Sequence, residues 1–324
     1  MKRYMLWTSL SLIILVLGVG GYYAFAVFHF AQDIQNSHKE SIFHQVNLTK
    51  NNANGSEVIG APEWESTKPI NVLLLGGDSR SVTKSDVPRS DSMLVASIHP
   101  ITKKACLFSI LRDTYVAIPG HGEDRINMAL TLGGPELAMK TVSDLFGIPI
   151  SYYVYTDFQG FIALIDALGG IEIEVEKNML YADTADDHLF DIQLKKGMQH
   201  LDGKMALQYV RFRHDAMSDF ARSERQRKFL TALASKLQSR WSFILLPKML
   251  HAVYPFVETN ISVSEMVKLA PLAMEVKVNE IVKVQLPPMN LVENKHVHGA
   301  SVIGVNVRKL KLYVQQLLAG TAPS

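Results

Sequence analysis

From residue 69 onward, short apolar runs alternate with longer amphipathic stretches. "INVLLLGGD", "DSMLVASIHP" and "KACLFSILRDTYVAI" are apolar runs typical of three buried β-strands, and the first of them ends in glycine. "GGPELAMKTVSDLFG" and "DFQGFIALIDALGG" have helical spacing and end at glycine, and the alternating "IEIEV" follows the second. The alternation predicts an α/β fold, with a central mixed β-sheet covered by helices. Further helices are predicted at residues 223–238, 264–274 and 307–318, the last closing the domain.

The N-terminal segment has a different pattern, because residues 4–28 contain no Asp, Glu, Lys or Arg. An apolar run of this length is long enough to span a bilayer with some tilt. Lys2 and Arg3 precede it, which favours a cytoplasmic N-terminus and an exported remainder. "AFA" at residues 24–26 resembles a signal-peptidase site, so a cleaved signal peptide is the alternative. We prefer an uncleaved anchor because apolar character continues beyond that site.

These patterns divide the chain into four parts. Residues 33–68 are mostly polar, with Asn, Ser, Gly and Pro clustered towards the end, which indicates a stalk. The 48% hydrophobic composition is enough to fill the core of one large domain. Cys106 is the only cysteine, lies in an apolar run and has no partner for an internal disulfide. The predicted parts are a cytoplasmic segment (1–3), a transmembrane anchor (4–28), an extracellular stalk (29–68) and an extracellular α/β domain (69–324).

Arginines concentrate in "ALQYVRFRHDAMSDFARSERQ", residues 206–226, although the formal net charge of the chain is only +2. If residues 222–237 form a helix, Arg222 and Gln226 open the stripe that continues as Phe229, Leu230, Leu233 and Leu237. Arg225 lies at the edge of this stripe. Arg227 is rotated about 100° from Gln226, which predicts that it points towards solvent.

In the preceding stretch "LQYVRFR", side chains with polar ends (Tyr209, Arg211, Arg213) alternate with apolar ones (Val210, Phe212). We predict an extended segment in which Tyr209, Arg211 and Arg213 share one side. Two elements would then aim guanidinium groups inward, which indicates a nearby polyanion, because unpaired buried charges are costly. Planar bidentate donors suit phosphate well. The alternative is an ordinary solvated basic surface.

Polar residues also follow the predicted strands, where open α/β sheets bind their ligands. Asp78 follows the first strand, Arg112 follows the third, and Arg125 comes shortly after. Arg89 and Asp91 stand at the start of the second strand, and an antiparallel hairpin would return them to the same end as Asp78. Two carboxylates facing many arginines are suited to hold a Mg²⁺ that also binds substrate phosphates. The alternative is a turn aspartate and a structural ion pair.

Other chemistries lack their motifs in the sequence. "GGDSRS" lacks the Gly-Lys-Ser/Thr ending of an ATP-binding loop, and no Gly-x-Ser-x-Gly elbow occurs. "HVH" at residues 296–298 has no third ligand at zinc-site spacing. The sequence has no helix-turn-helix pattern and no strongly basic domain, so it does not indicate a nucleic-acid partner.

The blocks "NVLLLGGDSR", "RSDSMLVASI", "SILRDTYVAIPGHGEDRINMAL" and "LKKGMQHLDGKMALQYVRFRHDAMSDFARSERQRKFL" together resemble the LytR-CpsA-Psr family of Gram-positive cell-envelope proteins. The block "GGPELAMKTVSDLFGIPISYYVYTDFQGFIALIDALGGIEIEV" belongs to the same resemblance, which covers residues 70–237 nearly continuously. The resemblance is specific because the blocks occur in order and share their spacing. Where many members read "IPRDT" this chain has "ILRDT", so a loop-shaping proline is missing at Leu111.

The resemblance implies a single-pass membrane protein whose extracellular domain is a phosphotransferase. Such an enzyme would move a glycopolymer, such as wall teichoic acid or capsular polysaccharide, from undecaprenyl pyrophosphate to peptidoglycan through a phosphodiester. It implies Asp78, Asp91 and Arg112 as catalytic residues, with Asp78 and Asp91 holding Mg²⁺ or Mn²⁺. The implied pyrophosphate-binding residues are Arg89, Arg112, Arg125, Arg211, Arg213, Arg222 and Gln226.

Two alternatives stay open at this point. A prenyl tail needs an apolar pocket, and the helices "AMKTVSDLF" and "FIALIDAL" are amphipathic enough to line one, but ordinary core packing explains them equally well. The rival function is a non-catalytic protein that binds lipid pyrophosphate or regulates the envelope. The carboxylates favour the enzyme, because anion binding alone does not require acidic residues beside the phosphate.

Overall fold

The computed structural model describes residues 21–23, 25–30, 32–33, 43, 65, 67–77, 90–182, 191–213, 218–297 and 299–321. Asp78 and Arg89, two of the predicted site residues, lie outside this part of the chain, as does most of the predicted anchor and stalk. Within the described residues, no helix is both long enough and apolar enough to cross a membrane. The anchor at residues 4–28 therefore stays a prediction.

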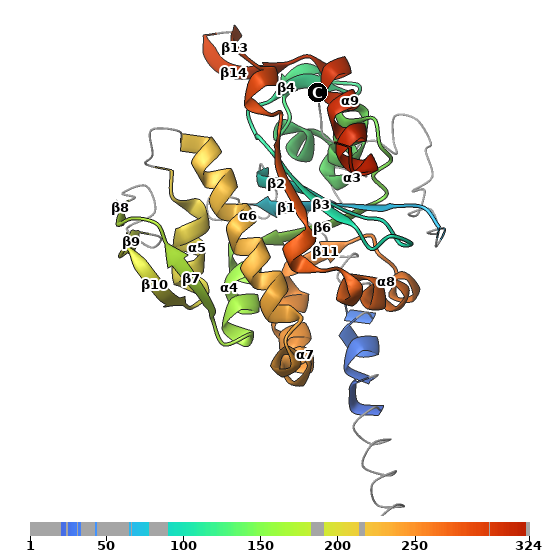
Figure 1. Ribbon diagram of the computed structural model, residues 1–324, viewed down its shortest axis with the longest axis vertical. Coiled ribbons are helices and arrows are strands. Elements are labelled where there is room, and N and C mark those ends of the chain that lie inside the picture. The colour runs from blue at the N-terminus through green and yellow to red at the C-terminus, as the bar shows by residue number, and fades with distance from the viewer. Residues whose placement is uncertain are drawn as a thin grey trace, which may run out of the picture.

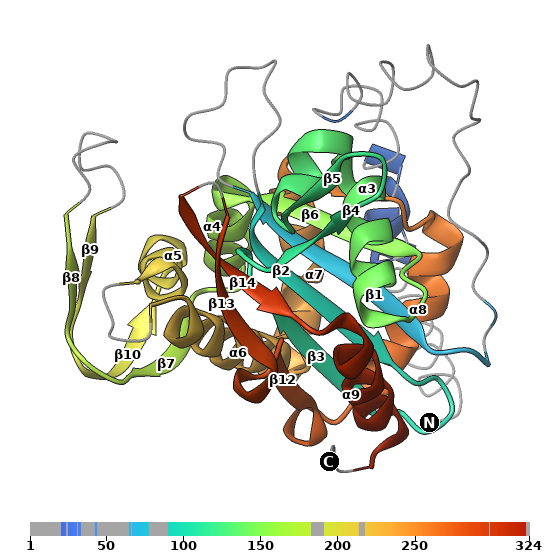
Figure 2. The same cartoon turned by 90° about the horizontal axis from the view of Figure 1, so that it is seen from above.

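A six-stranded mixed sheet forms the centre of the fold (Figures 1 and 2). Strand β1 runs parallel to β6, and β3 runs parallel to β12, whereas the other neighbours are antiparallel. The predicted hairpin of the first two strands is confirmed, because Gly77 pairs with Ser90. In order across the sheet, the strands are β11 (Val257–Thr259), β6 (Tyr152–Asp157), β1 (Ile70–Gly77), β2 (Ser90–Ile98), β3 (Ala105–Ile110) and β12 (Val282–Leu286).

Helices cover both faces of this sheet, as its apolar strands require. Two of them, α3 (Met128–Phe146) and α9 (Val307–Ala319), share one core with the side chains of Leu73 and Val95. Leu74 and Leu94 point to the opposite face, which α4 (Phe158–Ala167) and α6 (Ser218–Leu237) cover. The predicted last helix does close the domain, since it packs against α3 (Figure 1).

Several of the remaining elements form a second core with α4 and α6, beside the sheet (Figure 2). This core includes α5 (Gly203–Arg211), α7 (Arg240–Val253), β7 (Ile171–Val175), β8 (Met179–Tyr181), β9 (Ile192–Leu194) and β10 (Gly197–Leu201). Elsewhere, α8 (Val263–Glu275) packs near β6, and two further hairpins are β4–β5 (Tyr115–Ile118, Gly122–Arg125) and β13–β14 (Val292–Val297, Ala300–Val305).

Two predicted strands differ from the structure. "KACLFSILRDTYVAI" is not one strand, because the chain turns at residues 111–114 and continues as β4, which pairs with β5 outside the central sheet. "IEIEV" does form β7, but this strand pairs with β10 and not with the central sheet. Its alternation fits this position, because one side packs on the second core and the other faces solvent.

Candidate functional site

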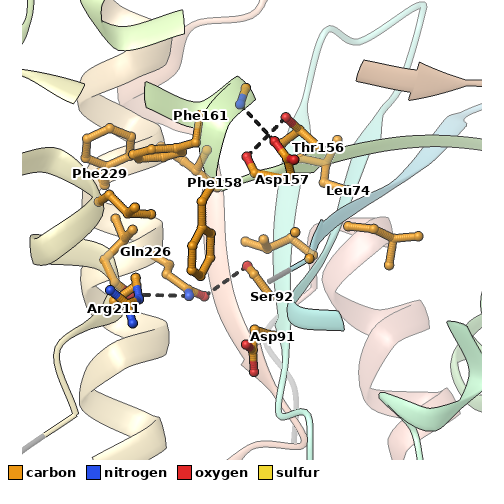
Figure 3. Close-up of a pocket in the computed structure, with 18 of the residues that line it drawn as sticks. Leu74, Asp91, Ser92, Thr156, Asp157, Phe158, Phe161, Arg211, Gln226 and Phe229 are labelled. Carbon is orange, nitrogen blue, oxygen red and sulfur yellow. Dashed lines mark hydrogen bonds between the residues drawn. The ribbon is translucent and has the colours of Figure 1, made fainter. Parts of the chain in front are cut away.

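A cavity of about 510 Å³ lies between the central sheet and the helices of its second face. Apolar side chains make up most of its lining. One polar group contains Asp91, Ser92, Gln226 and Arg211, and Thr156 and Asp157 lie apart from it (Figure 3). The walls come from β1, β2 and β6 and from helices α4 to α7. A largely apolar cavity with a few convergent polar groups is the usual form of a small-molecule site.

Asp91 is the centre of an ion-pair cluster at the polar end of the cavity. Its Oδ1 atom accepts a hydrogen bond of 2.7 Å from Arg112 Nη1 and one of 3.3 Å from Arg213 Nη2. Arg112 follows the end of β3, and Arg213 lies two residues beyond α5. The three side chains are 25–34% exposed, so the cluster is screened from solvent but still accessible. The predicted meeting of these residues is confirmed.

Helix α6 places Arg222 and Gln226 beside this cluster. Arg222 is 5% exposed and lines the cavity one turn before Gln226, whose Oε1 accepts a hydrogen bond of 3.3 Å from Ser92 Oγ on β2. Phe229 and Leu233 continue the same stripe along the apolar part. The predicted helical stripe is therefore confirmed, because its polar and apolar residues line one wall in the expected order.

Arg211 marks the boundary between the polar and apolar parts. Its guanidinium carbon lies 5.0 Å from the ring centre of Phe158, the first residue of α4. Such a cation–π contact orients the planar group while keeping its N–H donors at the polar side. Figure 3 shows the Phe158 ring between Asp157 and the polar cluster. Sequence reasoning missed Phe158, although its position after a strand that is parallel to β1 was an available signal.

The extended segment predicted at "LQYVRFR" is wrong, because α5 is helical as far as Arg211. The Asp202 side chain caps α5 by accepting from the Met205 amide, and Ala206 and Val210 are buried at helical spacing. Tyr209 does not share a side with the arginines, since its hydroxyl donates to Glu176. Burial, and then the nearby Glu176 carboxylate, raise the pKa of this tyrosine.

Arg225 contacts the segment that carries Arg211 and Arg213. Arg225 is only 3% exposed. Its guanidinium donates a hydrogen bond to the carbonyl oxygen of Phe212, and its Cζ atom lies 5.3 Å from the centre of the Phe212 ring. Its Nη1 also donates to Glu176 Oε1 at 3.2 Å. Because Phe212 separates Arg211 from Arg213, this contact anchors both of them to α6.

Arg125 is not among the described residues that line the cavity. Its Nε lies 3.5 Å from Asp113 Oδ1, and Asp113 Oδ2 lies 3.6 Å from Arg112 Nε. Arg125 therefore contacts the cluster through Asp113. Two further predicted members of the site, Asp78 and Arg89, are outside the described residues, and their placement stays a prediction.

Arg227 does not point to solvent as predicted. It is only partly exposed and donates a hydrogen bond of 3.2 Å from Nη1 to Ser109 Oγ on β3. Burial lowers the pKa of its guanidinium, and the neighbouring Glu224 opposes this effect. The side of α6 that was predicted to face solvent packs against β12, which pairs with β3 at the edge of the sheet.

Of the two amphipathic helices for which lining a pocket and core packing were left open, α4 lines the apolar part of the cavity and α3 does not. Phe161 and Leu164 of α4 face the cavity, whereas Leu137, Val142 and Leu145 of α3 are buried in the other core. Ordinary core packing is therefore the correct interpretation for α3. The described lining residues include four arginines (Arg112, Arg211, Arg213, Arg222) and two aspartates (Asp91, Asp157).

At the ion-pair cluster, Asp91 leaves one carboxylate oxygen open to a metal ion. Both hydrogen bonds of Asp91 end on Oδ1, and none of the described residues donates to Oδ2. Carboxylate oxygens are the ligands that Mg²⁺ prefers, and it commonly keeps several waters. No group of three His, Cys, Asp or Glu side chains among the described residues is arranged to hold a metal. Asp91 therefore fits an ion that shares its remaining ligands with a bound anion.

Comparisons with known proteins agree on one family. The LytR_cpsA_psr family model matches residues 24–317. The Regulatory protein MsrR of Staphylococcus aureus is 39% identical over 194 residues, which are 59% of this chain and 56% of that protein. The chain thus aligns with little more than half the length of MsrR.

A second relative and a solved structure match over more of the chain. The polyisoprenyl-teichoic acid–peptidoglycan teichoic acid transferase TagU of Bacillus anthracis is 33% identical over 267 residues, covering 82% of this chain and 81% of TagU. The structure of the LytR-CPS2A-psr family protein YwtF (TagT) with bound octaprenyl pyrophosphate lipid superposes with a TM-score of 0.59. It is 28% identical and covers 82% of this chain and 97% of its own.

Proposed function

Because this chain belongs to the LytR_cpsA_psr family, we propose that it transfers a glycopolymer from a polyprenyl pyrophosphate carrier to peptidoglycan. The observation that carries the proposal is the cavity, which joins an apolar interior to a cluster of arginines. An apolar wall suits a prenyl tail, and guanidinium groups suit the pyrophosphate. TagU is named as a polyisoprenyl-teichoic acid–peptidoglycan teichoic acid transferase, and the TagT structure holds octaprenyl pyrophosphate lipid.

The charges around the cavity match such a donor. The four arginines exceed the two aspartates that line the described cavity by two positive charges, and a pyrophosphate diester carries two negative charges. Arg222 is buried and Arg112 and Arg213 are mostly buried, so their attraction for an anion is only partly screened by water. The site is therefore expected to bind the donor through electrostatic and hydrogen-bond contacts at one end and apolar contacts along the rest.

The proposed reaction is a phosphoryl transfer. A peptidoglycan hydroxyl oxygen attacks the phosphorus that carries the glycopolymer and releases its proton to water. The bond from that phosphorus to the bridging oxygen breaks, and polyprenyl monophosphate leaves. Negative charge develops on the leaving phosphate, where preorganised arginines stabilise it most effectively. Arg112 and Arg213 are held in place by Asp91, and Arg211 by the ring of Phe158.

Mg²⁺ is the proposed cofactor, with Asp91 and Asp78 as its protein ligands and Mn²⁺ as a substitute. A bound divalent ion would supply additional charge neutralisation at the pyrophosphate. Asp91 by itself is surrounded by arginines, which repel a cation from the ligand-free site. The metal is therefore expected to bind together with the pyrophosphate and much more weakly alone.

The protein is proposed to act at the outer face of the cytoplasmic membrane. The support is the charge-free run at residues 4–28, which follows Lys2 and Arg3. The octaprenyl pyrophosphate lipid in the TagT structure and the polyisoprenyl-teichoic acid in the name of TagU agree with this location. Residues 69–324 would then lie outside the cell, where peptidoglycan is accessible.

The test uses the purified full chain in detergent micelles, a lipid-linked glycopolymer, a peptidoglycan oligomer and Mg²⁺. Formation of polymer-linked peptidoglycan and release of polyprenyl monophosphate are both expected. The variant Lys309→Met should transfer the polymer like wild type, because Lys309 is exposed on α9 and lies outside the cavity. Tight donor binding with no transfer to any peptidoglycan oligomer would instead support the rival function, a lipid-pyrophosphate-binding protein.

A further inference from the structure

A second pocket, of about 390 Å³, lies on the other side of α6 from the cavity. Its walls include Phe220, Glu224 and Arg227 of α6 together with Lys283 of β12 and the following Pro288 and Met289. At 100° per residue, the pocket-lining residues of α6 lie roughly opposite Arg222, Gln226 and Phe229. The two hollows therefore flank the same helix.

Among the described residues Arg227 and Lys283 form no ion pair at this pocket, although the charge of the neighbouring Glu224 carboxylate acts on Arg227. Arg227 is partly buried and donates to the neutral hydroxyl of Ser109, and burial lowers the pKa of its guanidinium. Lys283 is exposed beside it, and the described residues form no ion pair with either side chain. A partly desolvated guanidinium with one neutral acceptor is energetically costly, and a bound anion would offset that cost.

The lining indicates what kind of anion fits. Arg227, Lys283 and Glu224 together carry one net positive charge, which matches one carboxylate better than a doubly charged phosphate. Glu224 is exposed at the same pocket, where its carboxylate is placed to accept from an amide N–H. Phe220, Pro288 and Met289 supply apolar contact for a small carbon skeleton. A short peptide with a free carboxylate has all three features.

The pocket is also close to the reacting end of the cavity. Arg227 follows Gln226 in α6, and Ser109 is three residues before Arg112. The Leu111 amide donates to the carbonyl oxygen of Leu286, which joins the start of the Arg112 loop to the strand that carries Lys283. A ligand in this pocket would lie on the outer side of α6, so the donor lipid in the cavity would not compete with it for space.

We propose that this second pocket binds the carboxylate-bearing peptide of the peptidoglycan acceptor through Arg227 and Lys283. The proposal rests on the transferase function proposed above. It gives the acceptor a binding site separate from that of the donor, on one shared helix. The acceptor glycan would then extend from the pocket towards Arg112.

The test measures binding of muramyl dipeptide to the full chain by calorimetry, without any transfer reaction. The carboxamide derivative of muramyl dipeptide lacks the negative charge of the carboxylate. Glycerol 3-phosphate represents a phosphate of a donor polymer. We expect Lys283→Met and Arg227→Gln each to weaken muramyl dipeptide binding about tenfold, the effect of one charge-assisted contact. The carboxamide should bind wild type about tenfold more weakly as well. Lys309→Met, which removes an exposed lysine from α9, should bind like wild type.

Several results would overturn the proposal. These are undetectable binding of muramyl dipeptide to wild type, equal binding by wild type and the exposed-site variant Lys283→Met, or tighter binding of glycerol 3-phosphate than of muramyl dipeptide. The last result would assign the pocket to a phosphate of the donor polymer. Thermal unfolding of each variant identifies any loss caused by misfolding, and Lys283→Met carries the test if Arg227→Gln is unstable. Octaprenyl pyrophosphate titrated into the same proteins tests the proposed function independently.

Discussion

Replacing Arg222 by lysine tests whether the polar end of the cavity binds pyrophosphate through planar guanidinium groups. Arg222 is 5% exposed, lines the cavity and lies one helical turn before Gln226. Lysine keeps the positive charge but replaces the fork of N–H donors by a single ammonium on a flexible chain. The substitution therefore changes hydrogen-bond geometry while it leaves the net charge of the cavity unchanged.

The expected loss follows from the burial of this side chain. A hydrogen bond to a charged group contributes about 1.5–3 kcal/mol, and at 5% exposure solvent screening reduces that value little. If lysine makes one of two phosphate contacts, the dissociation constant for octaprenyl pyrophosphate should rise about ten- to hundredfold. Coulomb attraction is retained, so binding should weaken without being abolished.

Isothermal titration of octaprenyl pyrophosphate into the full chain measures this change. Arg308→Lys is the matched control, because Arg308 is exposed on α9 and is not among the residues that line the cavity. Thermal unfolding of both variants separates lost affinity from lost stability. Equal affinity of Arg222→Lys, Arg308→Lys and wild type would refute the reasoning, since the buried arginine would then make no directional contact with the pyrophosphate.

Three further predictions concern the carboxylate, the apolar wall and the topology. Asp91→Ala should abolish Mg²⁺-supported transfer but preserve or tighten donor binding without metal, because a negative charge is removed beside the anion; near-normal transfer by the folded variant would contradict an essential role. Leu230→Gln, in the cavity wall, should weaken octaprenyl pyrophosphate binding about tenfold and leave inorganic pyrophosphate unaffected, as judged against Leu312→Gln on the exposed side of α9. Protease added to intact cells should digest residues 69–324, and survival of this domain would exclude the proposed topology.

The elements predicted correctly are those whose pattern is complete within a short stretch of sequence. Helix α6 shows its buried stripe through Phe229 and Leu233, and β1 and β2 show apolar runs joined closely enough to favour a hairpin. The hairpin in turn explains why Asp91 could be assigned to the same end of the sheet as the residues after β1. Its partner Arg112 was predicted there because it follows β3, whereas Arg213 was assigned to the site from the alternating segment and from the family resemblance.

The errors occurred where distant residues decide the environment. "LQYVRFR" alternates over seven residues, but Tyr209 is buried beside Glu176, which lies 33 residues earlier, and the segment is helical. The Asp202 cap is a local signal for this helix that sequence reasoning missed. Arg227 was placed towards solvent by its angle about the helix axis, yet Ser109 accepts its hydrogen bond from a strand more than a hundred residues away. Such contacts have no local periodicity, so a sequence pattern does not reveal them.

The amino-acid sequence alone therefore defines the α/β class, the amphipathic helices and the set of arginines and carboxylates that share a ligand chemistry. These properties depend on residue type and on the period of helix or strand. Tertiary structure decides which of them meet: Arg112 and Arg213 reach Asp91 directly, whereas Arg125 stands behind Asp113. It also decides that α4 lines the cavity while α3 fills a core, because an amphipathic face does not specify which surface will cover it.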